Sequence, residues 1–131
     1  MGETETILPV NADTFADSIS VDMPRDGVRA VRAATQTGGA YIAVPDDEIL
    51  MAMRDLAAEE AIFAEPAGAT SYAGLVKAVK SGLIAPDQHH LVLITGSGLK
   101  DVPAALEAVE EPTVIEPSLE ALKAAVKQGQ E

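Results

Sequence analysis

One short stretch of this sequence combines hydroxyl side chains and glycines in a spacing suited to ligand binding. The apolar run at residues 91–94 is followed by Thr95, Gly96, Ser97 and Gly98. An apolar strand that ends in a small-residue turn before a helix lies at the edge where open α/β sheets bind ligands. We expect Thr95 at that edge, with the glycines allowing a planar ligand to approach the backbone. An ordinary tight turn without a ligand is the alternative, because strands followed by such turns are common.

Alternating helix and strand patterns surround this turn and must position it. Short strands are predicted at residues 7–10, 40–44, 91–94 and 113–115, the first at a sheet edge because Pro9 lacks a donor. Helices are predicted at residues 24–38, 46–57, 66–81 and 101–109, and from Ser118 onward. This order predicts one α/β unit over residues 1–131, a three-layer helix-sheet-helix arrangement with a short, mainly parallel sheet.

Several residues are expected to begin, end or bury these helices. Asp46 and Ser118 have side chains that can cap a helix N-terminus, and Gly82 is expected to end the helix before it. Leu106 and Val109 are expected to face inward from the helix that starts near Asp101. Aromatic residues make up only 3% of the chain, so its core is expected to be aliphatic and rich in alanine.

The helix that begins after Glu65 is unusual because its first two turns consist largely of small residues. Glycine normally weakens a helix by about 1 kcal/mol, so close packing is the expected compensation. The sequence leaves open whether these small residues pack against a sheet alone or against a bound ring. Pro66 suits the first helical position, where its missing N–H would be unpaired anyway.

Two stretches resemble threonine synthases, which are pyridoxal-phosphate enzymes of the tryptophan synthase β-subunit fold, also called fold type II. Residues 95–101 read Thr-Gly-Ser-Gly-Leu-Lys-Asp, similar to the family's T-G-x-G-L-K-D segment. Residues 65–69 read Glu-Pro-Ala-Gly-Ala, similar to its E-P-A-[GS]-A stretch. Residues 16–19 and 46–50 add weaker matches, so the resemblance covers most of the chain in the family's order. Ser97 departs from the His or Asn that the family often has there.

The resemblance implies that pyridoxal 5'-phosphate is the cofactor of the complete enzyme. By this resemblance, Thr95 would face the pyridine nitrogen, and Gly96, Ser97 and Gly98 would line the edge of the ring. Glu65 would also lie near the cofactor, although a buried glutamate that caps the helix is an equal alternative. The implied reaction converts O-phosphohomoserine and water to threonine and phosphate.

Two parts of the family's active site have no match in this sequence. Neither the lysine that anchors the cofactor nor the glycine-rich cup for its phosphate is present, so no residue here is predicted to be catalytic. We therefore expect the C-terminal part of such an enzyme, inactive and without bound cofactor when alone. Its expected partner is the rest of a threonine synthase chain, or itself as a homo-oligomer. The alternatives are a stand-alone binding or oligomerisation module and a segment of a related threonine deaminase.

Charge and composition exclude several other functions. The net charge of −12 over 131 residues disfavours nucleic acids and anionic membranes, and would suit an acidic cytoplasmic protein. With no cysteine, disulfides and thiolate chemistry are excluded. His89 and His90 are adjacent near a predicted strand, so they would point to opposite faces, and no metal site is predicted.

Overall fold

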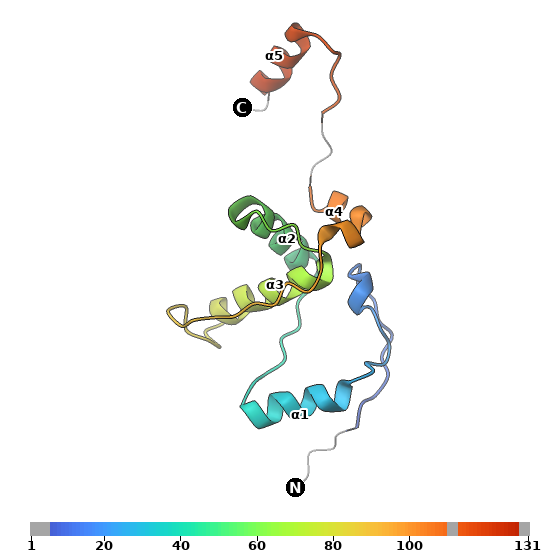
Figure 1. Cartoon of the computed structure of the whole chain (residues 1–131), viewed down its shortest axis with the longest axis vertical. Helices are drawn as coiled ribbons and strands as arrows, with labels where there is room; N and C mark the ends of the chain where they lie inside the picture. Colours follow the sequence, from blue (N-terminus) through green and yellow to red (C-terminus); the bar gives the residue numbers. More distant parts are fainter. Residues whose placement is uncertain (1–5, 110–112, 129–131) are drawn as a thin grey trace.

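The computed structural model describes residues 6–109 and 113–128, and nearly all regular structure in them is helical (Figure 1). The elements are η1 (Asp17–Ile19), α1 (Gly27–Thr37), α2 (Asp46–Glu60), α3 (Pro66–Lys80), η2 (Gly98–Lys100), α4 (Val102–Glu107) and α5 (Leu119–Gln128). The two η elements are single 3₁₀-helical turns. Each predicted helix is therefore confirmed, with ends shifted by a few residues.

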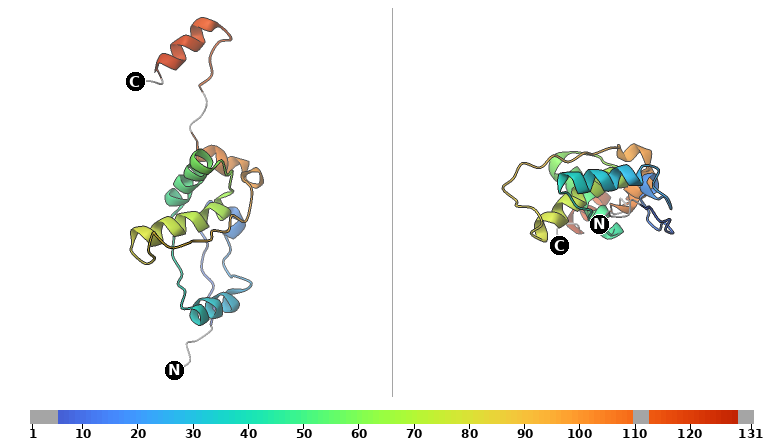
Figure 2. Two further views of the ribbon diagram at one scale, coloured as in Figure 1. Left: turned by 60° about the vertical axis from the view of Figure 1, so that its left-hand side comes forward. Right: turned by 90° about the horizontal axis from the view of Figure 1, so that it is seen from below.

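Helices α2 and α3 pack against each other and form the core (Figures 1 and 2). The buried side chains of α2 recur at helical spacing, so they form one face. They are Ile49, Ala52, Met53 and Leu56. Against them lie small buried residues of α3, Ala69 and Ala73. Small side chains let the two helices approach closely. The buried cluster consists of Ala, Ile, Leu and Met residues, so the prediction of an aliphatic, alanine-rich core is confirmed.

The start of α2 differs from the prediction. Asp46 was expected as the N-cap, but Pro45 holds that position and Asp46 is the first helical residue. Its carboxylate is used elsewhere, because Oδ1 accepts a hydrogen bond from the Thr14 hydroxyl at 2.6 Å and Oδ2 accepts one from the Phe15 N–H at 3.1 Å. The prediction of a cap was wrong because the carboxylate binds the N-terminal segment instead.

The ends of α1 and α3 and the start of α5 follow the sequence signals more closely. Gly38, with φ of 68°, ends α1, and Gly82, with φ of 71°, follows the end of α3. The Ser118 hydroxyl accepts a hydrogen bond from the Ala121 N–H at 3.1 Å, so the cap of α5 is confirmed. Leu106 and Val109 were predicted to face inward, but both are exposed, because α4 turns Ala104 and Ala108 toward the interior instead.

The predicted sheet is not confirmed. Residues 40–45 and 91–95 are extended, but no strand ladder forms among the residues that the structure describes. Residues 91–94 nevertheless show the alternation of a strand. Val92 and Ile94 are half-buried, whereas Leu91 and Leu93 are 88% and 66% exposed. The segment therefore has the side-chain pattern of a strand without a paired neighbour.

Segment 91–95 runs alongside α3 (Figures 1 and 2). This packing positions the turn that follows residue 95. The Ser71 hydroxyl of α3 donates a hydrogen bond to the Leu93 carbonyl at 3.0 Å. Gly68 lies against the backbone of Gly96, where a Cβ would come within 3.3 Å of its nitrogen and oxygen. The small residues of α3 thus hold this segment close to the helix.

Candidate functional site

The turn after residue 95 is attached to the segment that leads into α3 by a short backbone bridge. Ala64 and Ser97 form an isolated antiparallel β-bridge. The Gly98 N–H donates to the Phe63 carbonyl at 2.9 Å, and the Glu65 N–H donates to the Gly96 carbonyl at 3.0 Å. These bonds fix the turn at the N-terminus of α3, a helix that the sequence order of strand, turn and following helix did not point to.

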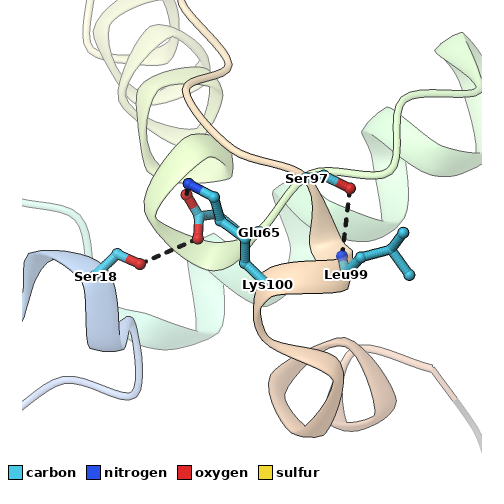
Figure 3. Close-up of polar contacts among 5 residues, drawn as sticks. All are labelled: Ser18, Glu65, Ser97, Leu99 and Lys100. Carbon is cyan, nitrogen blue, oxygen red and sulfur yellow. Dashed lines mark hydrogen bonds and ion pairs between the residues drawn. The ribbon is translucent and has the colours of Figure 1, made fainter.

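The two hydroxyl side chains of the turn have different surroundings. Thr95 is exposed, and its hydroxyl forms no hydrogen bond with any residue in 6–109 or 113–128. Ser97 is also exposed, but its Oγ accepts a hydrogen bond from the Leu99 N–H at 3.3 Å and caps η2 (Figure 3). Thr95 is therefore free to meet a ligand, whereas Ser97 has a local structural task.

Glu65 is the polar residue most deeply buried at this site. It is 3% exposed and occupies the N-cap position of α3, yet its side chain makes no cap hydrogen bond. Its Oε2 accepts a hydrogen bond from the Ser18 hydroxyl at 3.1 Å, and its Oε1 lies 3.6 Å from the Lys100 ammonium (Figure 3). Glu65 is therefore a buried N-cap residue, as the alternative expected, but its side chain does not cap the helix, because the carboxylate connects η1 and η2 instead.

Both glycines of the turn have a packing reason to be glycine. A Cβ on Gly96 would overlap the Glu65 carboxylate, and a Cβ on Gly98 would overlap the Phe63 ring. The turn can thus close onto the entry to α3 only without these side chains. The expected roles of Gly96, Ser97, Gly98 and Glu65 beside a cofactor ring remain predictions.

Sequence reasoning missed two residues of this site, Ser18 and Lys100. The sequence matches included both residues, but neither was assigned a role. The signal that could have found them is Glu65 itself, because a buried carboxylate requires partners. Lys100 is the only basic residue in the motif at residues 95–101, which contains the turn.

Neither a metal-binding cluster nor a membrane-spanning helix is found among the described residues. They hold no group of three or more His, Asp or Glu residues that could bind a metal ion. His89 and His90 are exposed, and His90 Nε2 lies 3.0 Å from the Ala85 carbonyl. In the same residues, no helix has the length and apolar character needed to cross a membrane.

The sequence is similar to known threonine synthases over most of its length. The sequence is 42% identical over 118 residues to a threonine synthase of Methanocaldococcus jannaschii, covering 90% of this chain and 29% of that protein. It is 39% identical over 116 residues to a threonine synthase of Methanosarcina acetivorans, covering 88% and 29%. It is 40% identical over 95 residues to one of Mycobacterium tuberculosis, covering 72% and 26%.

The chain thus spans less than a third of the length of these relatives. A family model described as pyridoxal-phosphate dependent enzyme matches residues 2–96, which include Glu65, Thr95 and Gly96. The resemblance inferred from the two sequence motifs is therefore confirmed, and the chain belongs to the family of pyridoxal-phosphate dependent enzymes.

Proposed function

We propose that this chain forms the C-terminal part of a threonine synthase-like lyase that converts O-phosphohomoserine and water to threonine and phosphate. In this proposal it contributes the wall of the site that faces the pyridine nitrogen. The observation that carries the proposal is the Thr95 hydroxyl, which is exposed at the end of an extended segment and unpaired within the described residues. That segment is held to the N-terminus of α3 by backbone hydrogen bonds.

In this proposal, residues of this chain would hold one side of the cofactor. Bound pyridoxal phosphate supplies an electron sink for negative charge that develops on the substrate. The Thr95 hydroxyl can donate a hydrogen bond to the ring nitrogen without giving up its proton, so the nitrogen stays neutral. By leaving the ring nitrogen neutral, Thr95 would moderate the electron sink, which would favour elimination and replacement over transamination.

The same proposal assigns the missing parts of the site to further polypeptide. Lys77 pairs with Glu48 at 3.3 Å and Lys100 faces Glu65 at 3.6 Å, and we assign neither as the covalent anchor. This chain covers 29% or less of each of these relatives. The remaining length of such an enzyme is ample for the anchoring lysine and the phosphate cup.

The shape of the molecule supports such a partner. A hollow of about 640 Å³ lies between residues 38–42 and 89–93, and its lining includes Ser71, Gly74 and Ala78 of α3. Leu91 and Leu93 have exposed apolar side chains and line this hollow. They belong to the extended segment 91–95, which has no paired strand among the described residues. A strand from the remainder of the enzyme would both pair this backbone and cover these side chains.

Reconstitution tests the proposal directly. The chain is mixed with pyridoxal phosphate and with a polypeptide comprising the part of the M. jannaschii relative that has no counterpart here. We expect threonine and phosphate to form from O-phosphohomoserine only in the mixture, and borohydride to fix the cofactor on the added polypeptide. Turnover by this chain alone, or a fixed cofactor on one of its own lysines, would contradict the proposal. Absence of any association would favour the non-catalytic module, and release of ammonia from threonine would favour a deaminase.

A further inference from the structure

The Glu65 side chain contacts two segments that are far from it in the sequence. One oxygen of its carboxylate binds Ser18 of η1, and the other faces Lys100 at the end of η2 (Figure 3). The carboxylate itself lies beside Gly96, where it occupies the space that a Cβ would need. This one side chain therefore contacts η1, η2 and the turn between residue 95 and η2.

The two ends of the ion pair are unequally exposed. The Glu65 side chain is 4% exposed, whereas the Lys100 side chain is 62% exposed. A carboxylate held away from water is strongly disfavoured unless a charge or hydrogen-bond donors compensate it. Glu65 does not use the N–H groups of α3 for this purpose, since its side chain makes no cap hydrogen bond. Ser18 and Lys100 are thus the partners that permit the carboxylate to stay against Gly96.

We propose that Lys100 and Ser18 are positioning residues, which fix the Glu65 carboxylate against Gly96 and thereby hold the turn that presents Thr95. Removal of either partner would let the carboxylate move toward water and would loosen the backbone bonds beside it. Those bonds join Gly98 to Phe63 and Glu65 to Gly96. The connection to Thr95 as a cofactor-facing group rests on the proposed function, whereas the holding of the turn does not.

Amide hydrogen exchange on the chain alone measures this holding. In Lys100→Met we expect the Gly98 and Glu65 amides to exchange about 5 to 30 times faster. This factor corresponds to a loss of about 1–2 kcal/mol in the free energy of local opening. Lys100→Arg retains the charge, so its rates should return to within about twofold of the original. Lys80→Met is the matched control, because Lys80 is an exposed lysine at the end of α3, and it should leave both amides unchanged.

Two further variants keep the test decisive if Lys100→Met unfolds the chain. Ser18→Ala removes only a hydroxyl, so we expect a smaller acceleration at the same two amides. In the double variant Glu65→Gln with Lys100→Met, the loss of Lys100 should add little to the loss of the carboxylate charge. Unchanged exchange in Lys100→Met, or an equal rise at all amides of α2 and α3 in both Lys100→Met and Ser18→Ala, would overturn the positioning role.

The reconstituted mixture separates this inference from the proposed function. If the mixture makes threonine, Lys100→Met should weaken binding of pyridoxal phosphate, measured by equilibrium dialysis, and Lys100→Arg should restore it. If the mixture is inactive but the exchange rates change as expected, the proposed function fails and the positioning role stands. If the mixture is active but the exchange rates of the chain are unchanged in Lys100→Met, the proposed function stands and the positioning role fails.

Discussion

At the residue scale, the Glu65 carboxylate connects parts of the chain that are distant in the sequence, because Ser18 and Lys100 both contact it. Thr95 was expected at the end of an extended segment before a helix start, and the structure places it there. The partners of Glu65 were not foreseen, because Ser18 lies 47 positions away in the sequence. A local pattern such as Glu-Pro indicates a helix start, but it contains no information about which distant segment closes over it.

Gly96 provides the first prediction at this scale. Gly96→Ala should destabilise the chain by about 1–3 kcal/mol, because its methyl group would overlap the Glu65 carboxylate. Urea unfolding followed by circular dichroism measures the change. Gly74→Ala is the control, because there the nearest atom, Val44 Cγ2, is 3.9 Å from the new Cβ. Gly74 lies inside α3, so this variant should gain up to about 1 kcal/mol. Equal effects of the two variants would show that Glu65 does not occupy this space.

Tyr72 provides a prediction about pH. Its pKa is raised above the ordinary value of 10.0, first because of burial and then because of the negative charges of Asp55, Glu59 and Glu60. Because the folded-state pKa exceeds that of the unfolded chain, the protonated phenol contributes stability below about pH 10. That contribution is lost as the pH rises through the folded-state pKa.

Absorbance titration of the phenolate measures this shift. In a Tyr41→Phe background only Tyr72 titrates, and its midpoint should lie above pH 10.0. Adding Asp55→Asn should lower the midpoint, whereas Glu120→Gln on α5 should not change it. A midpoint at or below pH 10.0 in the Tyr41→Phe chain would contradict the burial of this side chain.

At the element scale, helices were predictable and the sheet was not observed. Periodic apolar residues mark α1, α2 and α3, and glycines mark the ends of α1 and α3, whereas Ala61 ends α2. These signals are local. A strand needs a neighbour that can be far away in the sequence or in another polypeptide. Residues 91–94 have a strand's alternating exposure but no partner among the described residues, so the pattern alone could not decide whether a sheet forms.

The packing of α2 on α3 gives the prediction at this scale. Ile49 of α2 is 2% exposed in the core, so Ile49→Ala should cost about 2–5 kcal/mol. Met51 lies two positions away and is 52% exposed, so Met51→Ala should change stability by no more than about 0.5 kcal/mol. Urea midpoints compare the two variants. Similar losses in both would show that α2 buries a different face.

At the scale of the whole molecule, much apolar surface lies outside the α2–α3 core. Large exposed side chains occur on extended segments and on outlying helices, including Leu91, Leu93, Val114, Leu119 and Val126. Helix α1 lies apart from α2 and α3 in Figure 1 and in the left-hand view of Figure 2. Apolar patches of this kind commonly mark surfaces that another polypeptide covers.

We accordingly expect the isolated chain to associate with itself. Sedimentation velocity should show a species larger than a monomer that grows with concentration, since unpaired extended backbone and apolar side chains favour association. Leu93→Lys should reduce the association, because Leu93 is 66% exposed beside the hollow. Leu106→Lys is the matched control, because Leu106 is 63% exposed on α4, away from that hollow. A monomer at all concentrations would contradict this expectation.

The central claim is that the Thr95 hydroxyl faces the cofactor's pyridine nitrogen, and one substitution series tests it. In the reconstituted enzyme, the rate of threonine formation is compared for Thr95→Ser and Thr95→Val. Serine keeps the hydroxyl, so we expect activity within about tenfold of the original, whereas valine keeps the shape and should lower the rate by a further factor of ten or more. Equal activity of the two variants would show that the hydroxyl has no part in the reaction.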